Sequence, residues 1–393
     1  MTVQPKLRFK GFTDDWEKRR LGELAIIQGG GTPSSTNSDY WNGNINWFTP
    51  TEVSNTGYVK DSARKITKLG LKKSSAKLLP KGTVLMTSRA GVGDMGILKV
   101  PATTNQGFQS MIPNEDVPSY FLYSMQSFIS KEANRLASGS TFSEISGKQV
   151  SKISINIPSE QGEKVQIGKL FEQLNNLITV NQRKVDLLKK KKSAYLQKLF
   201  PKTGSNIPEL RFKGYTDTWE KRKLYEIVKI TMGQSPNSKN YTDNPKDYIL
   251  VQGNADIRNG RVVPRVWTTQ ITKKADKNDL ILSVRAPVGD IGKTDFEVVL
   301  GRGVAAIKGN EFVYQTLSKM KINGYWKRFS TGSTFESINS IDIKNAEIFI
   351  PSDNEQYMVG TFFKSLDNLI TVNQRKVDLL KKKKKALLQQ MFI

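Results

Sequence analysis

The chain repeats itself at long range, and this duplication constrains its possible folds more strongly than any other feature. The run PKLRFKGFTDDWEKRR that starts at Pro5 returns at Pro208 as PELRFKGYTDTWEKRK. The run NLITVNQRKVDLLKKKK occurs without a single change at residues 176–192 and 368–384, and shorter matches lie between these anchors in the same order. The copies are much farther apart than the roughly 20–50 residues of solenoid repeats, which indicates two large halves of similar fold.

Each half begins with short β-favouring runs and ends with a helical pattern. Runs such as residues 153–157 and 279–284 are separated by Gly, Pro, Asn and Ser, as expected for a compact α/β domain. We therefore predict an α/β (α+β) fold in which two domains form a tandem pseudo-repeat and two long helices separate them. The domains are placed at residues 1–158 and 201–351, and the helical spacer regions at residues 159–200 and 352–393.

Apolar residues in both helical regions recur at alternating steps of three and four, which is typical of a coiled-coil seam. One Asn interrupts each seam, and a buried amide there would fix the register because a slip would leave it unpaired. We predict that the two helices pair with each other in antiparallel fashion; the alternative is an amphipathic helix that lies on its own domain. The predicted pairing residues are Leu174, Ile178, Asn181, Val185 and Leu188 in the first helix, and Ile370, Asn373, Val377 and Leu380 in the second.

The charge of the chain predicts a polyanionic partner. Its 393 residues include 61 Lys and Arg against 36 Asp and Glu, which gives a net charge of +25 and a strongly positive field. Nucleic acid is favoured over an acidic membrane surface, because no apolar run approaches the roughly 18–20 residues of a membrane span. The first residues also lack the apolar core of a signal peptide, so a cytoplasmic location is expected.

Several kinds of catalytic site are excluded or weakly indicated. The chain has no Cys and no His, which excludes disulfides, thiolate zinc sites and Ser–His pairs. GVGDMG at residues 91–96 fits a dinucleotide-binding pattern, but its counterpart starts with Pro287 and no acidic ribose ligand follows, so we interpret it as a turn in a sheet. The segment 292–294 lacks the first glycine of a phosphate-binding loop, and Asp342 lacks an upstream acidic partner for a metal nuclease.

Differences between the halves carry information about function. The helices and the FKG-Phe/Tyr-TD-x-W segments are nearly identical in both halves, whereas the domain interiors differ. Two equivalent helical regions that carry two different DNA-binding domains suit an asymmetric, two-part site on a duplex. Half-sites separated by one helical turn lie roughly 34 Å apart. The alternative is a recent duplication whose helices have not yet diverged.

In this doubled order, the chain resembles the DNA-specificity subunit of type I restriction–modification systems. The resemblance rests on the FKG-Phe/Tyr-TD-x-W segments, the GGTP turn at residues 30–33 with the aromatic runs 39–43 and 47–50, and the LI-x-x-NQRK helices. It implies two target-recognition domains that each read half of a split DNA site. The second half departs from the family pattern, since Tyr241-Thr-Asp-Asn-Pro245 replaces the aromatic element.

The resemblance also implies partners. It implies double-stranded DNA, two DNA-methylation subunits docked on the helical regions, and restriction or translocase subunits. S-adenosylmethionine, ATP and Mg²⁺ are expected on those subunits and not on this chain, which would be non-catalytic and direct adenine methylation and restriction. Two alternatives remain open: a self-sufficient DNA modification or cleavage enzyme, and a basic nucleic-acid-binding scaffold without sequence preference.

Candidate DNA contacts come from comparing the halves. Polar positions shared by both are expected at phosphates, which position a protein, and positions that differ are expected at bases. Gln106 aligns with Arg302, and these two residue types favour adenine and guanine. The shared positions are Arg89 with Arg285, Ser140 with Ser333, and Thr141 with Thr334. Further candidates are Thr32, Trp41, Asn42 and Asn44 in the first domain, and Ser235, Asn237, Lys239, Gln252, Asn254, Arg258, Arg261 and Arg265 in the second.

Each group of candidates has a structural alternative. The shared polar residues could form hydrogen bonds in sheet turns, Trp41 could anchor a surface loop, and some basic residues of the second domain could be merely solvated. The lysine runs 189–192 and 381–385 could follow phosphates, but a solvated or subunit-docking helix face is favoured.

Overall fold

The chain forms two compact units. The computed structural model describes residues 4–53, 57–89, 91–137, 144–202, 204–329 and 337–392. Unit 1 combines Met1–Arg183 with Arg375–Ile393, and unit 2 is the continuous segment Lys184–Gln374. This division falls inside the two long helices, whereas the predicted domain boundaries follow the changes in sequence pattern at the helix ends.

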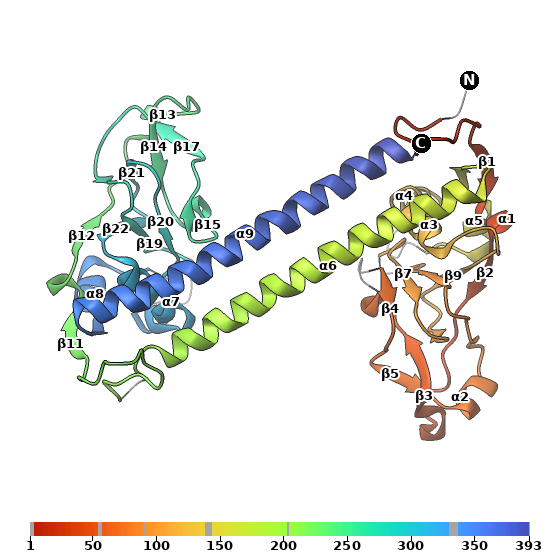
Figure 1. Cartoon of the computed structure of the whole chain (residues 1–393), viewed down its shortest axis with the longest axis horizontal. Coiled ribbons are helices and arrows are strands. Elements are labelled where there is room, and N and C mark those ends of the chain that lie inside the picture. Colours follow the sequence, from red (N-terminus) through yellow and green to blue (C-terminus); the bar gives the residue numbers. More distant parts are fainter. Residues whose placement is uncertain are drawn as a thin grey trace. The chain divides into compact units, whose positions relative to one another are not determined.

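Unit 1 is built on a five-stranded sheet in the order β2-β9-β6-β7-β4, accompanied by the three-stranded sheet β5-β3-β8 and the pair β1-β10 (Figure 1). Strands β6 and β7 are buried along their whole length and form the centre of its core. The strands are β1 (Glu17–Arg20), β2 (Ala25–Gly29), β3 (Trp41–Phe48), β4 (Tyr58–Val59), β5 (Arg64–Ile66), β6 (Val84–Met86), β7 (Met95–Leu98), β8 (Thr103–Thr104), β9 (Gln109–Pro113) and β10 (Ser154–Ile157). The short helices are α1 (Leu21–Leu24), α2 (Lys68–Lys72), α3 (Ser119–Ser124), α4 (Gln126–Leu136) and α5 (Gly147–Lys152), with 3-10 turns η1 (Ser38–Tyr40) and η2 (Pro50–Glu52).

Unit 2 has a related architecture. Its sheets are β12-β22-β19-β20-β16-β15, β13-β17-β14-β21-β18 and β11-β23. The strands are β11 (Glu220–Lys223), β12 (Lys229–Met232), β13 (Tyr241–Thr242), β14 (Tyr248–Val251), β15 (Ile257–Arg258), β16 (Arg261–Val262), β17 (Val266–Thr268), β18 (Lys274–Ala275), β19 (Leu280–Ser283), β20 (Ile291–Lys293), β21 (Val298–Leu300), β22 (Val304–Lys308) and β23 (Glu347–Ile350). The short helices are α7 (Glu311–Ile322) and α8 (Ser340–Lys344), with 3-10 turns η3 (Leu224–Glu226), η4 (Ser238–Asn240), η5 (Asn254–Asp256) and η6 (Tyr325–Phe329).

The two units share their central topology, which confirms the predicted tandem α/β pseudo-repeat. The order β2-β9-β6-β7 in unit 1 matches β12-β22-β19-β20 in unit 2, and the parallel pair β3 and β8 matches β14 and β21. The β runs expected at residues 153–157 and 279–284 form β10 and β19. The glycine-rich segment 91–96 turns from β6 into β7, as predicted, with positive φ angles of 109° at Gly91 and 95° at Gly93.

The repeated segment at the start of each half has the same packing in both units. In unit 1, Arg8 forms a bidentate ion pair with the buried Glu163, in which Arg8 Nε lies 2.8 Å from Glu163 Oε1. In unit 2, Arg211 does the same with the buried Glu355 at 2.7 Å. The tryptophan of the segment also lies in the core of each unit. The repeat therefore conserves a structural attachment of each domain to a long helix.

Helices α6 (Gln161–Lys198) and α9 (Asp353–Met391) contribute residues to both units. Within unit 1, Phe171 of α6 stacks on Phe392, which directly follows α9, at 5.8 Å between ring centroids. One turn later in α6, Asn175 lines the same pocket as Leu388, which precedes Phe392 in the sequence, so the two helices run in opposite directions there. Within unit 2, Tyr195 contacts Phe362 and Lys192 binds Asp367, again in antiparallel order. This confirms the predicted antiparallel pairing.

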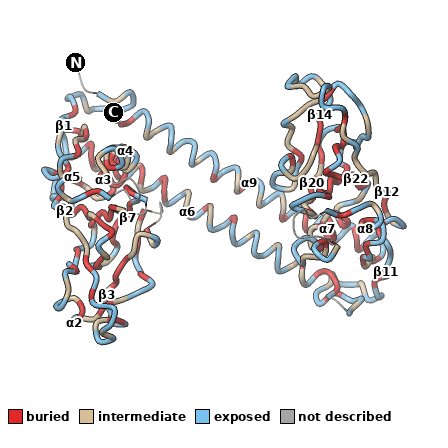
Figure 2. Tube along the Cα trace, turned by 180° about the vertical axis from the view of Figure 1, so that it is seen from behind, coloured by how far each residue is buried: buried red, intermediate tan, exposed pale blue. Residues whose placement is uncertain are grey.

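The predicted seam residues lie on the inner side of the helices. In Figure 2, α6 and α9 alternate between buried and exposed positions along their length. The five fully buried seam positions are Leu174, Asn181, Val185, Asn373 and Val377, and the remaining four are half-buried. The amides of Asn181 and Asn373 donate to the carbonyls of Leu177 and Leu369, each at 2.7 Å. Because these bonds lie within one helix, each amide would keep its hydrogen bond after a register slip. The two Asn residues therefore fix the register less strongly than predicted from the sequence.

Among the residues that the structure describes, no helix combines the length and the apolarity that a membrane span requires.

Candidate nucleic-acid interface

A pocket of about 610 Å³ opens in unit 2 where several strands end. Most of its lining comes from segments that follow β12, β14, β19 and β21, and Tyr241 of β13 and Arg265, which precedes β17, complete it. Strands β14 and β21 are parallel neighbours, so their carboxyl ends meet at the same edge and bring their following loops together. The lining residues are Ser235, Tyr241, Gln252, Gly253, Asn254, Ala255, Asp256, Arg265, Arg285, Ala286, Pro287, Arg302 and Gly303.

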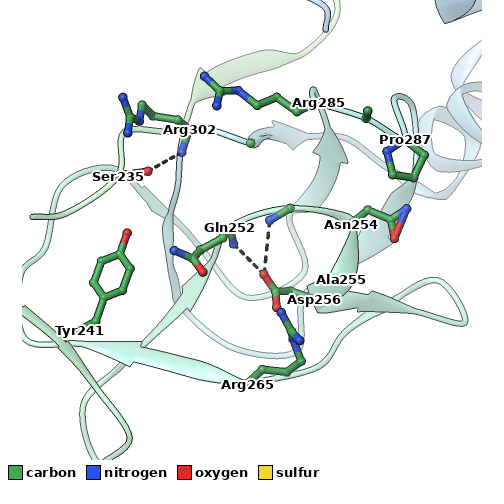
Figure 3. A pocket seen from close by; sticks show the side chains of 13 residues that line it. Ser235, Tyr241, Gln252, Asn254, Ala255, Asp256, Arg265, Arg285, Pro287 and Arg302 are labelled. Carbon is green, nitrogen blue, oxygen red and sulfur yellow. Dashed lines mark hydrogen bonds and ion pairs between the residues drawn. The ribbon is translucent and has the colours of Figure 1, made fainter. Parts of the chain in front are cut away.

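Asp256 organises the floor of this pocket. Its buried carboxylate accepts hydrogen bonds from the backbone N–H groups of Gln252 at 2.8 Å and Gly253 at 3.3 Å. Its second oxygen accepts from Nε of Arg265 at 2.7 Å. The loop after β14 and the Arg265 side chain are therefore held in place by one carboxylate (Figure 3).

Two further arginines lie along the rim. Figure 3 shows the guanidinium groups of Arg285 and Arg302 on the same side of the pocket, and both residues are exposed. The backbone N–H of Arg302 donates to Ser235 Oγ at 3.0 Å, which fixes the start of its side chain. Within the described ranges of the chain, no carboxylate pairs with either guanidinium. Three guanidinium groups thus face one carboxylate, and the pocket is suited to an anionic or base-edge ligand.

The pocket also presents amide and hydroxyl groups. The Nδ2 of Asn254 donates to Asp290, which also pairs with Lys321, so this amide is already engaged. The side-chain amide of Gln252 forms no hydrogen bond with a described residue and points toward the side on which Tyr241 lies (Figure 3). Gln252 is therefore better placed than Asn254 to contact a ligand.

The structure brings together six of the candidates predicted in the second domain and leaves four elsewhere. Ser235, Gln252, Asn254, Arg285 and Arg302 line the pocket, as does Arg265. The four others do not line it: Asn237 caps η4 and accepts from the Lys239 backbone, while Arg258 and Arg261 face each other across the β15–β16 hairpin. Arg261 is further engaged by Asp295 at 2.8 Å. The candidates Ser333 and Thr334 lie outside the described residues.

Unit 1 has a corresponding corner with different side chains. Thr32, which follows β2, donates through Oγ1 to the side-chain carbonyl of Gln106, which follows β8. In unit 2 the equivalent hydroxyl, that of Ser235, meets the backbone of Arg302 instead. Arg89 follows β6 as Arg285 follows β19. The predicted pairing of Gln106 with Arg302 therefore corresponds to equivalent places in the two units, and Ser140 and Thr141 lie outside the described residues.

The prediction of Trp41 as a DNA contact does not fit its environment. Its ring is buried against Trp47 at 5.0 Å, its Nε1 donates to the carbonyl of Ser34, and the Arg64 guanidinium covers it at 3.7 Å. The alternative, an aromatic anchor for a surface loop, accounts for this packing. Asn42 and Asn44, near the start of β3, are both exposed.

Two pocket residues with polar side chains, Tyr241 and Asp256, were not among the sequence candidates. Tyr241 lies where the second half departs from the aromatic pattern of the first, and that departure was the available signal. Asp256 gave no signal, because its role depends on Arg265 and on backbone groups that only the fold brings together.

The segments that partly match catalytic motifs form structural contacts. Lys293 pairs with Glu311 at 2.6 Å, and the buried Thr294 donates to the carbonyl of Phe296. Asp342 accepts from the backbone of Asn339 and caps α8. Across the part of the chain that the structure describes, no group of three or more Asp or Glu residues is arranged to hold a metal ion.

Comparisons with known proteins agree with this architecture. The family model described as the type I restriction modification DNA specificity domain matches residues 13–190 and 216–382. The specificity subunit of the type I restriction enzyme MjaIX of Methanocaldococcus jannaschii is 32% identical over 249 residues, which cover 59% of this chain and 56% of that protein. A specificity subunit assigned to the enzyme MjaX of the same organism is 27% identical over 409 residues, with coverage of 96% and 93%. The crystal structure of the type I restriction–modification system S subunit from M. genitalium has a similar fold, with a TM-score of 0.71, 14% identity and coverage of 100% and 99%.

Proposed function

Because this chain belongs to the family of type I restriction–modification DNA-specificity subunits, we propose that it recognises a bipartite, asymmetric duplex site and directs adenine methylation and restriction by partner subunits. The observation that carries the proposal is the pair of equivalent corners. Arg89 and Arg285 follow equivalent strands, β6 and β19. Beside them the two units differ, because the hydroxyl of Thr32 meets Gln106 and the equivalent hydroxyl of Ser235 meets Arg302. Gln favours adenine and Arg favours guanine, so two similar frames would read different bases.

Selection from randomised duplexes tests this proposal. The purified chain, or its complex with the methylation subunits, should enrich two different short motifs separated by a fixed gap. Gln106→Ala should relax one motif and Arg302→Ala the other, and each variant serves as the control for the other half. Enrichment of a single motif, or of none, would contradict bipartite reading.

The long helices are proposed to set the gap. Insertion of one heptad between Gln166 and Lys184 should change the gap or abolish binding, while each half-motif stays the same, because α6 contributes to both units. An unchanged gap in the selected duplexes would refute this role of the helices.

Exposed apolar residues on the helices support docking of partner proteins. Leu177, Val180 and Leu187 of α6 are 51%, 63% and 66% exposed. Their repeat counterparts on α9 are Leu369, Val372 and Leu379, which are 50%, 63% and 65% exposed. Exposed apolar groups of this kind are typical of interaction surfaces. Two equivalent stripes favour two copies of one partner, which we assign to the DNA-methylation subunit.

Charge substitutions on these stripes test the docking. Val180→Asp should remove one methylation subunit from the purified complex, and Val180→Asp with Val372→Asp should remove both, as measured by the mass of the complex in solution. Gln173→Asp, at another exposed position of α6, is the matched control. Retention of both subunits by the double variant would place docking elsewhere.

Catalysis is proposed to reside on the partners. S-adenosylmethionine, ATP and Mg²⁺ would bind there, and methylation of an adenine amino group requires the base to leave the stack. The isolated chain, supplied with duplex DNA and either S-adenosylmethionine or Mg²⁺, should show no turnover. Turnover would favour the self-sufficient enzyme instead. A scaffold without specificity would show steep salt dependence and no sequence preference.

A further inference from the structure

Unit 1 contains a second pocket, of about 360 Å³, beside the two long helices. It is lined by residues of the α3–α4 region, α6 and α9. Phe171 and Leu388 supply apolar walls, and Ser124, Ser127 and Tyr123 supply hydroxyl groups. Lys384 of α9 and Asn175 of α6 also line it.

The equivalent place in unit 2 holds internal ion pairs. Lys192 binds both oxygens of Asp367 at 2.7 and 2.8 Å, and Gln315 donates to the same carboxylate at 2.9 Å. Beside them, Lys293 pairs with Glu311 at 2.6 Å. Two ammonium groups are thus matched by two carboxylates.

Unit 1 keeps one of these ammonium groups and neither carboxylate. The unchanged repeat 176–192 and 368–384 makes Lys384 the counterpart of Lys192, and places Asn175 where unit 2 has Asp367. Phe121 and Phe312 contact equivalent phenylalanines, so Tyr120 stands where unit 2 has Glu311. The turns 89–96 and 285–292 match in sequence, so Ile97 of unit 1 corresponds to Lys293 of unit 2.

Lys384 is therefore a half-buried cation without a counter-charge. Among the described residues, no carboxylate lies within ion-pair distance of its Nζ, and burial lowers the pKa of Lys384. The Asn175 amide donates to Tyr120 Oη at 2.5 Å, so it does not replace the missing carboxylate. Withdrawing an ammonium from water without a partner is unfavourable, and an anion in the pocket would remove that penalty.

We propose that this pocket binds the carboxylate of a small aliphatic acid, which takes at Lys384 the place that the Asp367 side chain holds at Lys192. The Lys384 ammonium donates one hydrogen bond to the carboxylate, and the Ser127 hydroxyl, which also lines the pocket, donates a second. Phe171 and Leu388 contact the aliphatic part. The pocket volume lies within the roughly 300–1,000 Å³ that small-molecule sites occupy.

Calorimetric titration of the full chain with sodium propionate tests the proposal, with sodium chloride at the same ionic strength as the reference. The wild-type chain should bind propionate saturably, with one site per chain and more tightly than chloride. Lys384→Met should abolish binding. Asn175→Asp should also abolish it, because an internal carboxylate then occupies the site, and this variant should unfold at a higher temperature than the wild type.

Lys192→Met is the matched control, since the same substitution at the equivalent position should leave propionate binding unchanged. Lys384→Met removes the ammonium, whereas Asn175→Asp keeps it and supplies an internal carboxylate, so a folding defect in Lys384→Met does not remove the test that Asn175→Asp provides. Propionate binding no tighter than chloride binding, or binding that survives in both Lys384→Met and Asn175→Asp, would overturn the proposal.

Discussion

Arginine side chains in this chain serve two purposes that their sequence context does not separate. Arg8 and Arg211 belong to the repeated opening segments and are held by buried glutamates. Arg285 corresponds to Arg89 of the first half, and Arg302 corresponds to Gln106. The guanidinium groups of Arg285 and Arg302 nevertheless lie at a pocket rim. The difference depends on which carboxylate the fold brings near, a contact between residues far apart in the sequence.

The rim arginines should differ in their effect on DNA binding. Arg302→Ala should cost about 1–3 kcal/mol for the selected site and relax preference at one position, as expected for a base contact. Arg285→Ala should weaken binding to all duplexes equally and reduce the slope of log affinity against log salt by about one, as expected for a phosphate contact. Titrations by fluorescence anisotropy at several salt concentrations measure both quantities. A uniform loss in Arg302→Ala would remove it from base reading.

The buried ion pair of unit 2 should contribute strongly to stability. Glu355→Gln leaves the half-buried Arg211 guanidinium without its counter-charge, and loss of one partner of a buried pair costs about 3–5 kcal/mol. Asp295→Asn removes an exposed partner of Arg261 and should cost about 0–1 kcal/mol. Urea unfolding followed by circular dichroism measures both changes. Equal effects of the two amide substitutions would contradict the importance of burial.

Lys319 should make the stability of unit 2 depend on alkaline pH. Burial lowers the pKa of Lys319 from its usual 10.5 to about 8, while Nζ donates to the carbonyl of Pro201 at 2.7 Å. Between these values the unfolded chain keeps a proton that the folded chain has lost, so the free energy of unfolding should rise as the pH increases from about 8 toward 10.5.

Urea midpoints across this pH range measure the effect. Lys319→Met should flatten the rise, and Lys327→Met, at an exposed position of the same unit, should leave it in place. A rise of the same size in wild type and Lys319→Met would assign it to another group.

At the scale of elements, periodic patterns were predictable and the special environment of single side chains was not. The long helices and their buried seam follow from spacing that is visible along the chain, as do β10 and β19. The burial of Trp41 depends on Arg64 and Trp47, which reach it through pairing of β3 with β5 and through packing. Asp256 is a similar case, since its three hydrogen bonds form only in the folded loop.

The turn between β6 and β7 predicts a difference between two glycines. Both have positive φ, so a side chain at either is strained by about 1–3 kcal/mol. A Cβ at Gly93 would additionally lie 2.8 Å from the Cα of Ser130 in α4, whereas a Cβ at Gly91 meets only Asp94 Oδ2, at 3.6 Å. Gly93→Ala should therefore lower the thermal unfolding midpoint more than Gly91→Ala. The reverse order would contradict the close packing of the turn on α4.

At the scale of the whole molecule, the two halves of the sequence do not coincide with the two compact units. Unit 2 is one continuous segment, and unit 1 combines residues 1–183 with residues 375–393. Met391 and Phe392 lie in the main core of unit 1, where the rings of Phe392 and Trp16 pack edge to face with their centroids 6.0 Å apart. Sequence comparison reveals the duplication but assigns each helix to its own half, because packing across the repeat leaves no local signal.

Fragments should differ accordingly. Residues 184–374 should fold alone, since they hold the Phe200, Trp219, Phe312 and Phe363 cluster entirely. Residues 1–183 should be less stable and should gain stability when a peptide of residues 375–393 is added. Circular dichroism and thermal unfolding of both fragments check this, and a scrambled peptide is the control. A fragment 1–183 that is unaffected by the peptide would show that Phe392 is dispensable.

The contact of Trp16 with Phe392 has a consequence for biosynthesis. Domains generally fold during translation in N-terminal to C-terminal order, at about 5–20 residues per second. Here every residue of unit 2 is synthesised before Phe392, so the first-made domain lacks this core aromatic until unit 2 has been made. The order of completion is therefore inverted relative to the order of synthesis. A chain interrupted late in translation would carry an exposed aromatic core at its older end, which makes that end the target for chaperones and proteases.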